Sequence, residues 1–177
     1  MKSLVQLFFS ISTMGKGPQD VPYSKPLFVI LIIIIAVMDL FVLNALSREM
    51  ATANAEEVDF SRHVLAYAFI MLVLIGSVAL LVRLHGYANR ILQTLTAMAG
   101  VEVIIKIVQI AILVITLAAG KLSIVSVIAY FLMVMTFGWI LIANFHIFMH
   151  ALSVSPLRAG AYSLAYFFLN VLLSSLY

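Results

Sequence analysis

The sequence predicts an all-α protein, a polytopic membrane bundle of five transmembrane helices preceded by an N-terminal amphipathic interfacial helix. Composition is the first observation: of 177 residues, 65% are hydrophobic and 10% are charged, whereas a soluble domain carries roughly 25% charged residues. The second is the presence of several apolar stretches of the roughly 20 residues that a helix needs to cross a bilayer core about 30 Å thick. The chain is therefore expected to sit in lipid.

The first fifteen residues predict a short helix with one apolar face. Leu4, Leu7, Phe8 and Ile11 recur at helical spacing, and Gly15 is placed to end the helix. A helix of this length rises only ~20 Å, which is too short to cross the hydrocarbon core. We expect it to lie along the membrane surface or against the protein's own spans.

A rigid connector follows, because Pro18 and Pro22 restrict the backbone around Asp20. Residues 1–25 therefore form an N-terminal unit, and residues 26–177 form the transmembrane domain. The residues of this unit expected at a partner or membrane surface are Leu4, Leu7, Phe8, Ile11, Pro18, Asp20 and Pro22.

Five stretches are long and apolar enough to be spans. Helix is expected in all of them, because an open strand leaves its backbone groups unsatisfied in lipid. Pro26 and Pro156 are typical of helix starts. The predicted spans cover about residues 26–47, 64–82, 91–119, 122–149 and 156–177.

Basic residues predict the orientation. With a cytoplasmic N-terminus, the inner segments hold Lys2, Lys16, Lys25, Arg83, Arg90 and Arg158, and the outer segments hold Arg48, Arg62 and Lys121. The positive-inside rule then places the C-terminus on the opposite face. The expected location is the inner membrane of a bacterium.

Charged residues inside the spans are the first candidate site. Glu102 and Lys106 are four residues apart, and Asp39 in the first span is expected at a similar depth, so the three should meet; Gln109 continues the same face. Two carboxylates against one ammonium leave an excess negative charge, so one acid is expected to hold a proton. The cluster is either a structural contact between spans or a proton or ion relay.

Histidines form the second candidate site. His146 and His150 are four residues apart on the fourth span, and His85 lies in the loop after the second. Imidazoles at this spacing bind zinc or ligate haem in some proteins. The alternative is that they are half-wet side chains at the bilayer boundary.

The chain resembles the Yip (Ypt-interacting protein) family, in particular its bacterial-type members. The resemblance rests on the five spans, the N-terminal segment and the connector residues GPQDVPYS. The family's Asp-Leu-Tyr-Gly-Pro type of motif is replaced by Gly17-Pro18-Gln19-Asp20. The resemblance implies a non-catalytic membrane organiser, and the missing motif leaves no basis for a Rab-type GTPase partner.

Three functions follow, none of them enzymatic, because the sequence has no cysteine, phosphate-binding loop or nucleophile elbow. The first is a scaffold or accessory subunit that binds other membrane proteins or itself. The second is a proton- or ion-coupled carrier or channel subunit that uses Asp39, Glu102 and Lys106. The third is a metal- or haem-binding protein that uses His146 and His150. Apart from the metal or haem of the third function, no cofactor is expected. No nucleic acid partner is expected either, because the basic residues form no stripe along the chain.

Overall fold

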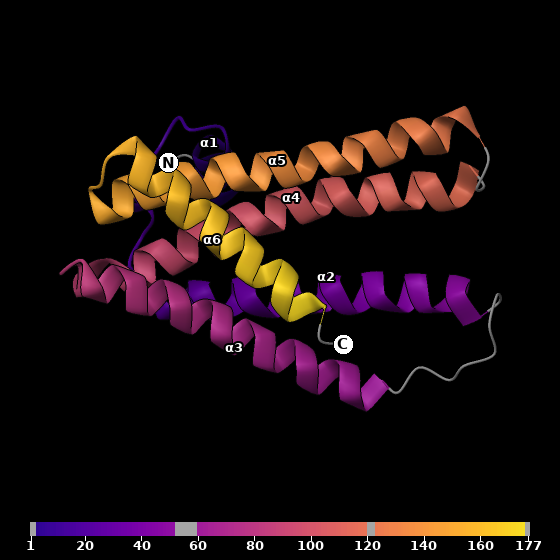
Figure 1. The fold of residues 1–177 in the computed structure, drawn as a ribbon, viewed down its shortest axis with the longest axis horizontal. Helices are drawn as coiled ribbons and strands as arrows, with labels where there is room; N and C mark the ends of the chain where they lie inside the picture. The colour runs from indigo at the N-terminus through magenta and orange to yellow at the C-terminus, as the bar shows by residue number, and fades with distance from the viewer. Residues whose placement is uncertain (1–2, 52–59, 120–122, 176–177) are drawn as a thin grey trace.

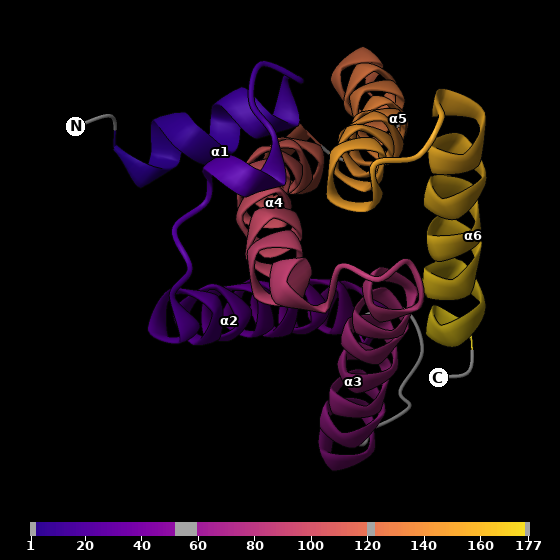
Figure 2. The ribbon, with the colours of Figure 1, turned by 90° about the vertical axis from the view of Figure 1, so that its left-hand side faces the viewer.

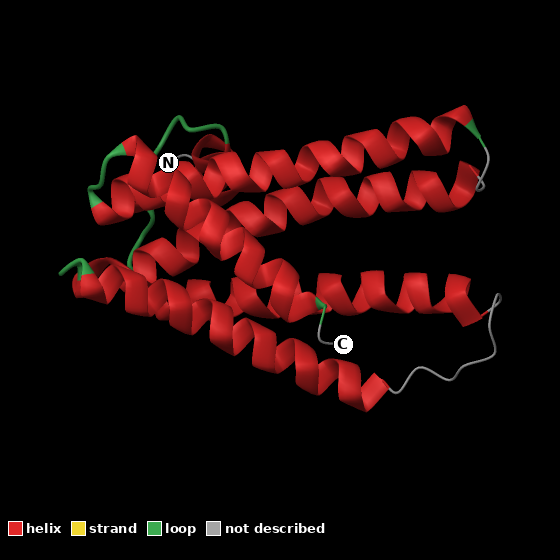
Figure 3. Cartoon of the chain, viewed as in Figure 1, coloured by secondary structure: helices red, strands yellow, loops and turns green. Residues whose placement is uncertain are grey.

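A computed structural model describes residues 3–51, 60–119 and 123–175. Throughout these ranges the regular structure is helical, without strands (Figure 3). Five of the described helices are long and apolar enough to cross a membrane. The predicted fold class, an all-α polytopic membrane bundle, is confirmed.

The helices follow the predicted spans closely. α4 coincides with the predicted third span, and α2 and α3 extend beyond their spans because polar flanking residues also continue the helix. The fourth predicted span begins at residue 122, which lies outside the described residues. The fifth ends with residues 176–177, which also lie outside them. The elements are α1 (Leu4–Ser12), η1 (Pro18–Asp20), α2 (Lys25–Ala51), α3 (Phe60–Leu84), η2 (Ala88–Arg90), α4 (Ile91–Ala119), α5 (Ile124–Leu152) and α6 (Pro156–Ser174).

α4 is the central helix of the bundle. It packs against α1, α2, α3 and α5, while α6 packs against α5 and α3 (Figures 1 and 2). We call the end where residues 17–25, 85–90 and 153–155 lie the connector end, and the opposite end the far end. Figures 1 and 2 show α6 running along one side of the bundle, from α5 at the connector end toward α3. α6 stops partway along the bundle, so the far end is built from the other four spans.

α1 lies across the sides of α4 and α5 at the connector end (Figure 2). The side chains of Leu7, Phe8 and Ile11 are buried there. Phe8 packs on Gly100 so closely that a Cβ atom added to this glycine would lie 2.2 Å from the Phe8 ring. The predicted apolar face therefore packs against the protein's own spans. Leu4 differs, because it remains 45% exposed.

Hydrogen bonds hold the rest of the N-terminal unit. The Trp139 indole N–H donates to the carbonyl of Ser12 over 2.9 Å, and the Gln93 amide donates to the carbonyl of Val21 over 3.0 Å. Pro18 is buried too. The expectation of a partner or membrane surface is thus wrong for Leu7, Phe8, Ile11 and Pro18, because these residues cover α4 and α5; Leu4, Asp20 and Pro22 are exposed.

The core lies in the connector half of the molecule. On α4, every residue from Thr94 to Val101 is buried, because α1, α2 and α5 surround this stretch. Further along the helix, Ile107, Val114 and Ile115 are exposed. Exposed apolar side chains of this kind suit contact with lipid, so this part of the surface agrees with an integral membrane protein.

Candidate functional site

An ion pair between Asp39 and Lys106 joins α2 to α4 in the middle of the membrane-spanning region. Lys106 Nζ donates to Asp39 Oδ1. The Tyr67 hydroxyl on α3 donates to the other oxygen, Oδ2, over 2.7 Å. Three spans thus meet at one carboxylate. The sequence prediction that Asp39 and Lys106 lie at the same depth is confirmed.

Glu102 is held less tightly than Asp39. Its Oε1 lies 3.7 Å from Lys106 Nζ, as the i,i+4 spacing predicts. This separation exceeds the roughly 2.7–2.9 Å of a charge-assisted hydrogen bond. The Glu102 side chain is 37% exposed, against 24% for Asp39 and 18% for Lys106. Glu102 is therefore the most accessible charge of the three.

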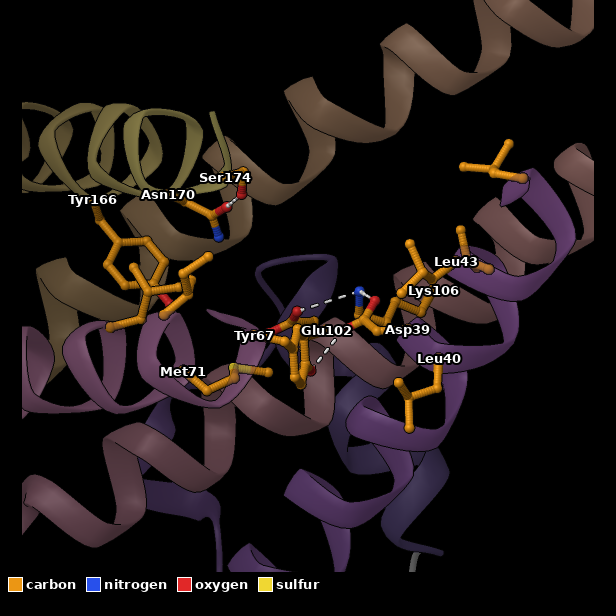
Figure 4. A pocket seen from close by; sticks show the side chains of 14 residues that line it. Asp39, Leu40, Leu43, Tyr67, Met71, Glu102, Lys106, Tyr166, Asn170 and Ser174 are labelled. Atoms are coloured by element: carbon orange, nitrogen blue, oxygen red, sulfur yellow. Dashed lines mark hydrogen bonds and ion pairs between the residues drawn. The ribbon is translucent and has the colours of Figure 1, made fainter. Parts of the chain in front are cut away.

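A cavity of about 300 Å³ opens beside these charges. Its walls come from α2, α3, α4 and α6 (Figure 4). One side carries the charged residues and Tyr67, and α6 contributes Tyr166, Asn170 and Ser174. The Ser174 hydroxyl lies 3.3 Å from Asn170 Oδ1. The remaining walls are apolar, made by Leu40, Val42, Leu43, Leu46, Ile70, Met71 and Leu74.

Glu102 and Tyr166 stand where several cavities meet. Both residues also line two smaller cavities, of about 30 and 60 Å³. Tyr166 lines a further cavity of about 180 Å³, which extends to Leu81 and Tyr162 near the connector end. Tyr166 thus lines cavities in both halves of the bundle, and Glu102 lines three of them.

Gln109 does not join the charged cluster, contrary to the prediction. Its amide donates to the Thr136 hydroxyl on α5 over 2.9 Å. Gln109 and Lys106 are about 60° apart around the helix axis. Because α4 lies between α2 and α5, that angle is enough to direct Lys106 toward α2 and Gln109 toward α5.

The three histidines are divided between two places. The rings of His146 and His150 lie 4.4 Å apart between centroids, and His146 Nε2 contacts the Lys16 carbonyl over 3.0 Å. His85 instead contacts the Tyr162 hydroxyl through Nε2 over 3.1 Å. The described residues contain no group of three His, Cys, Asp or Glu side chains that could hold a metal. The structure thus separates His85 from the other two.

Sequence reasoning missed several lining residues. Tyr67 and Asn170 are single polar residues inside apolar runs, and Ser174 stands beside Ser175; none of them has a spacing that links it to the charges. Tyr166 shares a helical face with Tyr162, which suggests packing as readily as a site. Tyr67 reaches the cavity from α3, and the packing of α6 against α3 and α5 brings Tyr166, Asn170 and Ser174 to it.

No family model matches this chain, and no curated protein and no solved structure matches it either.

Proposed function

We propose that the chain is a non-enzymatic carrier, or a subunit of a carrier or channel, that moves protons or small cations through the cavities meeting at Glu102. The observation that carries the proposal is the position of Glu102: an acid within a membrane span, more than a third exposed, at a junction of cavities. Ionisable residues at such positions commonly mark ion or proton pathways.

The charge count supports a cation as the species that is handled. Asp39 and Lys106 neutralise each other, and Tyr67 supports the pair. Glu102 is then the negative charge in excess. An uncompensated charge in a low-dielectric surrounding is unfavourable, so binding a proton or another cation at Glu102 stabilises the site.

The arrangement of cavities supports movement across the bundle. The large cavity reaches from Leu46 in the far half to Glu102. The cavity at Tyr166 and Leu81 continues toward the connector end, where His85 contacts Tyr162. Tyrosine, glutamate and histidine side chains are all able to hold and pass a proton. Residues of this kind are present in both halves of the membrane-spanning region: Glu102 and Tyr166 line the central cavities, and Tyr162 and His85 lie toward the connector end.

Proton flux into liposomes tests this proposal. Purified protein is reconstituted with a pH-sensitive dye inside the vesicles, and an acid jump is applied outside. Wild type should acidify the interior faster than protein-free vesicles, and Glu102→Gln should slow the flux by about 100-fold, because it removes a proton-transfer group. Gln109→Leu is the matched control, since Gln109 is a polar residue of the same helix that contacts α5. Equal flux in Glu102→Gln and wild type would refute the proposal.

A scaffold or accessory subunit is the second candidate function, and membership of the Yip family belongs to this proposal. It is favoured by the connector, whose backbone is held by Gln93 while Gln19, Asp20 and Tyr23 remain exposed. A photoreactive amino acid at Tyr23 should crosslink to one defined membrane protein or to a second copy. The same group at Val134, which is exposed on α5, should not. Adducts with lipid alone at Tyr23 would contradict this function.

We also propose a bacterial inner membrane location with a cytoplasmic N-terminus. The support is the distribution of basic residues, two of which, Lys2 and Lys121, lie outside the described residues. The five candidate spans found among the described residues support termini on opposite faces, because an odd number of crossings separates the two ends. Reporter fusions at Gly15 and after Tyr177 should report the cytoplasm and the opposite compartment, respectively. The same compartment at both sites would be incompatible with five crossings.

A further inference from the structure

We propose that the 300 Å³ cavity binds a small amphipathic organic cation, an amine with an apolar body, whose ammonium group pairs with Glu102. This inference rests on the proposed function, because it names the class of solute that the same site takes. Three features of the cavity carry it: its charge, its size and the distribution of polar groups on its walls.

The excess negative charge of the site favours a cation at the Glu102 carboxylate. Lys106 and Tyr67 already occupy both oxygens of Asp39. Glu102 is 3.7 Å from Lys106 and faces the cavity with the most exposed side chain of the three. A ligand ammonium at Glu102 would balance the excess charge and donate the charge-assisted hydrogen bonds that Lys106 gives to Asp39 instead.

The size of the cavity favours an organic ligand over a monatomic ion. A metal ion is held by several oxygen ligands close around it, and such a cage has no need of apolar walls. Here Leu40, Leu43, Ile70, Met71 and Leu74 line most of the space. A volume of about 300 Å³ lies at the lower end of the range for small-molecule pockets, roughly 300–1,000 Å³. An apolar body beside the ammonium would fill this volume.

The polar residues of α6 offer a second contact. Asn170 and Ser174 line the cavity on the wall contributed by α6, apart from the charged residues (Figure 4). A small number of polar groups within mostly apolar walls is the usual arrangement by which a pocket orients a ligand. The aromatic side chains of Tyr67 and Tyr166 complete the lining, and aromatic rings attract ammonium groups.

Binding of 2-phenylethylamine tests the inference, with 2-phenylethanol as the neutral probe of the same shape. Titration calorimetry in detergent should show that the amine binds wild type and Gln109→Leu equally. Glu102→Gln should weaken amine binding by about 10- to 100-fold, since it removes the partner of a desolvated charge pair. The alcohol should bind weakly and equally to all three proteins.

A second variant controls for the case in which Glu102→Gln loses binding because it misfolds. Leu40→Trp keeps every charge and narrows the cavity, so it should also weaken amine binding while its thermal unfolding stays cooperative. Amine binding that stays undiminished in both variants, or equals that of the alcohol in wild type, overturns the inference. Proton flux that depends on Glu102 without amine binding would reject this solute class and leave the proposed function standing. Amine binding without flux would reject the function alone.

Discussion

The two halves of the bundle are held together differently. In the connector half, α4 is buried on every side between Thr94 and Val101, where α1, α2 and α5 surround it. In the far half the same helix exposes Ile107 and Val114, and an ion pair joins it to α2. The N-terminal unit is therefore a structural part of the bundle, and the 300 Å³ cavity lies beyond the stretch of α4 that this unit covers.

The difference has a physical origin. Close packing of apolar side chains stabilises the connector half, where the cavities beside Met98 hold only about 30 and 60 Å³. The far half lacks both α1 and the full length of α6, so fewer side chains are available to fill it. The polar contacts at Asp39 take over part of the role of packing there, since interhelical hydrogen bonds stabilise membrane bundles.

The largest effect is expected from breaking the ion pair. Lys106→Met leaves Asp39 and Glu102 without their cation, and deletion of one partner of a buried pair typically lowers stability by about 3–5 kcal/mol. The triple change Asp39→Asn, Glu102→Gln, Lys106→Met should recover much of the loss, because it leaves no unpaired charge. The free energy of unfolding from SDS titration in mixed micelles measures both. A single Lys106→Met variant as stable as wild type would show that the pair does not hold the far half.

A smaller loss is expected in the connector half from Gly100→Ala. The added Cβ would overlap the Phe8 ring, and overpacking of this kind lowers stability by about 1–3 kcal/mol. Combining it with Phe8→Leu should cost less than the sum of the two single losses, since the smaller side chain relieves the overlap.

Gly138→Ala on α5 is the matched control for the overpacking test. Nothing lies within 4 Å of a Cβ atom built there, so this change should be neutral or stabilising by up to about 1 kcal/mol, as alanine is the better helix former. The same SDS titration applies. Equal losses at Gly100 and Gly138 would mean that α1 does not pack on α4.

The smallest effect is expected at the hydrogen bond from Trp139 to Ser12. Trp139→Phe keeps an aromatic ring but removes the indole N–H that donates to the Ser12 carbonyl. Loss of one such bond should lower stability by about 0.5–1.5 kcal/mol, and amide hydrogen exchange should increase in residues 4–12. Unchanged exchange in α1 would indicate that Trp139 does not hold this helix.

Much of the fold was predictable because the bilayer imposes a strong rule. Any apolar stretch of about 20 residues must satisfy its backbone internally, which makes it a helix. The pairing of Lys106 with Asp39 was predictable as well, since a buried charge requires a partner at its own depth. Both inferences need only the position of each residue within its own span and the thickness of the bilayer core.

What could not be predicted depends on how the helices pack. Leu7, Phe8 and Ile11 have the pattern of a membrane-binding face, and lipid and the surface of α4 are equally apolar partners for it. Gln109 and Lys106 are three residues apart, yet they reach α5 and α2, and only the position of α4 between those helices decides this. Asn170 lacks any local signal that connects it to Glu102.

Solvent access to Glu102 tests the central claim, a cavity in the membrane-spanning region that small cations can enter. The chain has no cysteine, so Glu102→Cys provides a unique thiol, and Val101→Cys, at a buried site, and Val114→Cys, at an exposed apolar one, are controls. The protein is treated in proteoliposomes with a charged trimethylammonium methanethiosulfonate, which modifies thiols that meet water. Cysteine at position 102 should be modified faster than at both control positions. Modification at position 102 as slow as at position 114 would contradict a water-accessible cavity, and with it the proposed path.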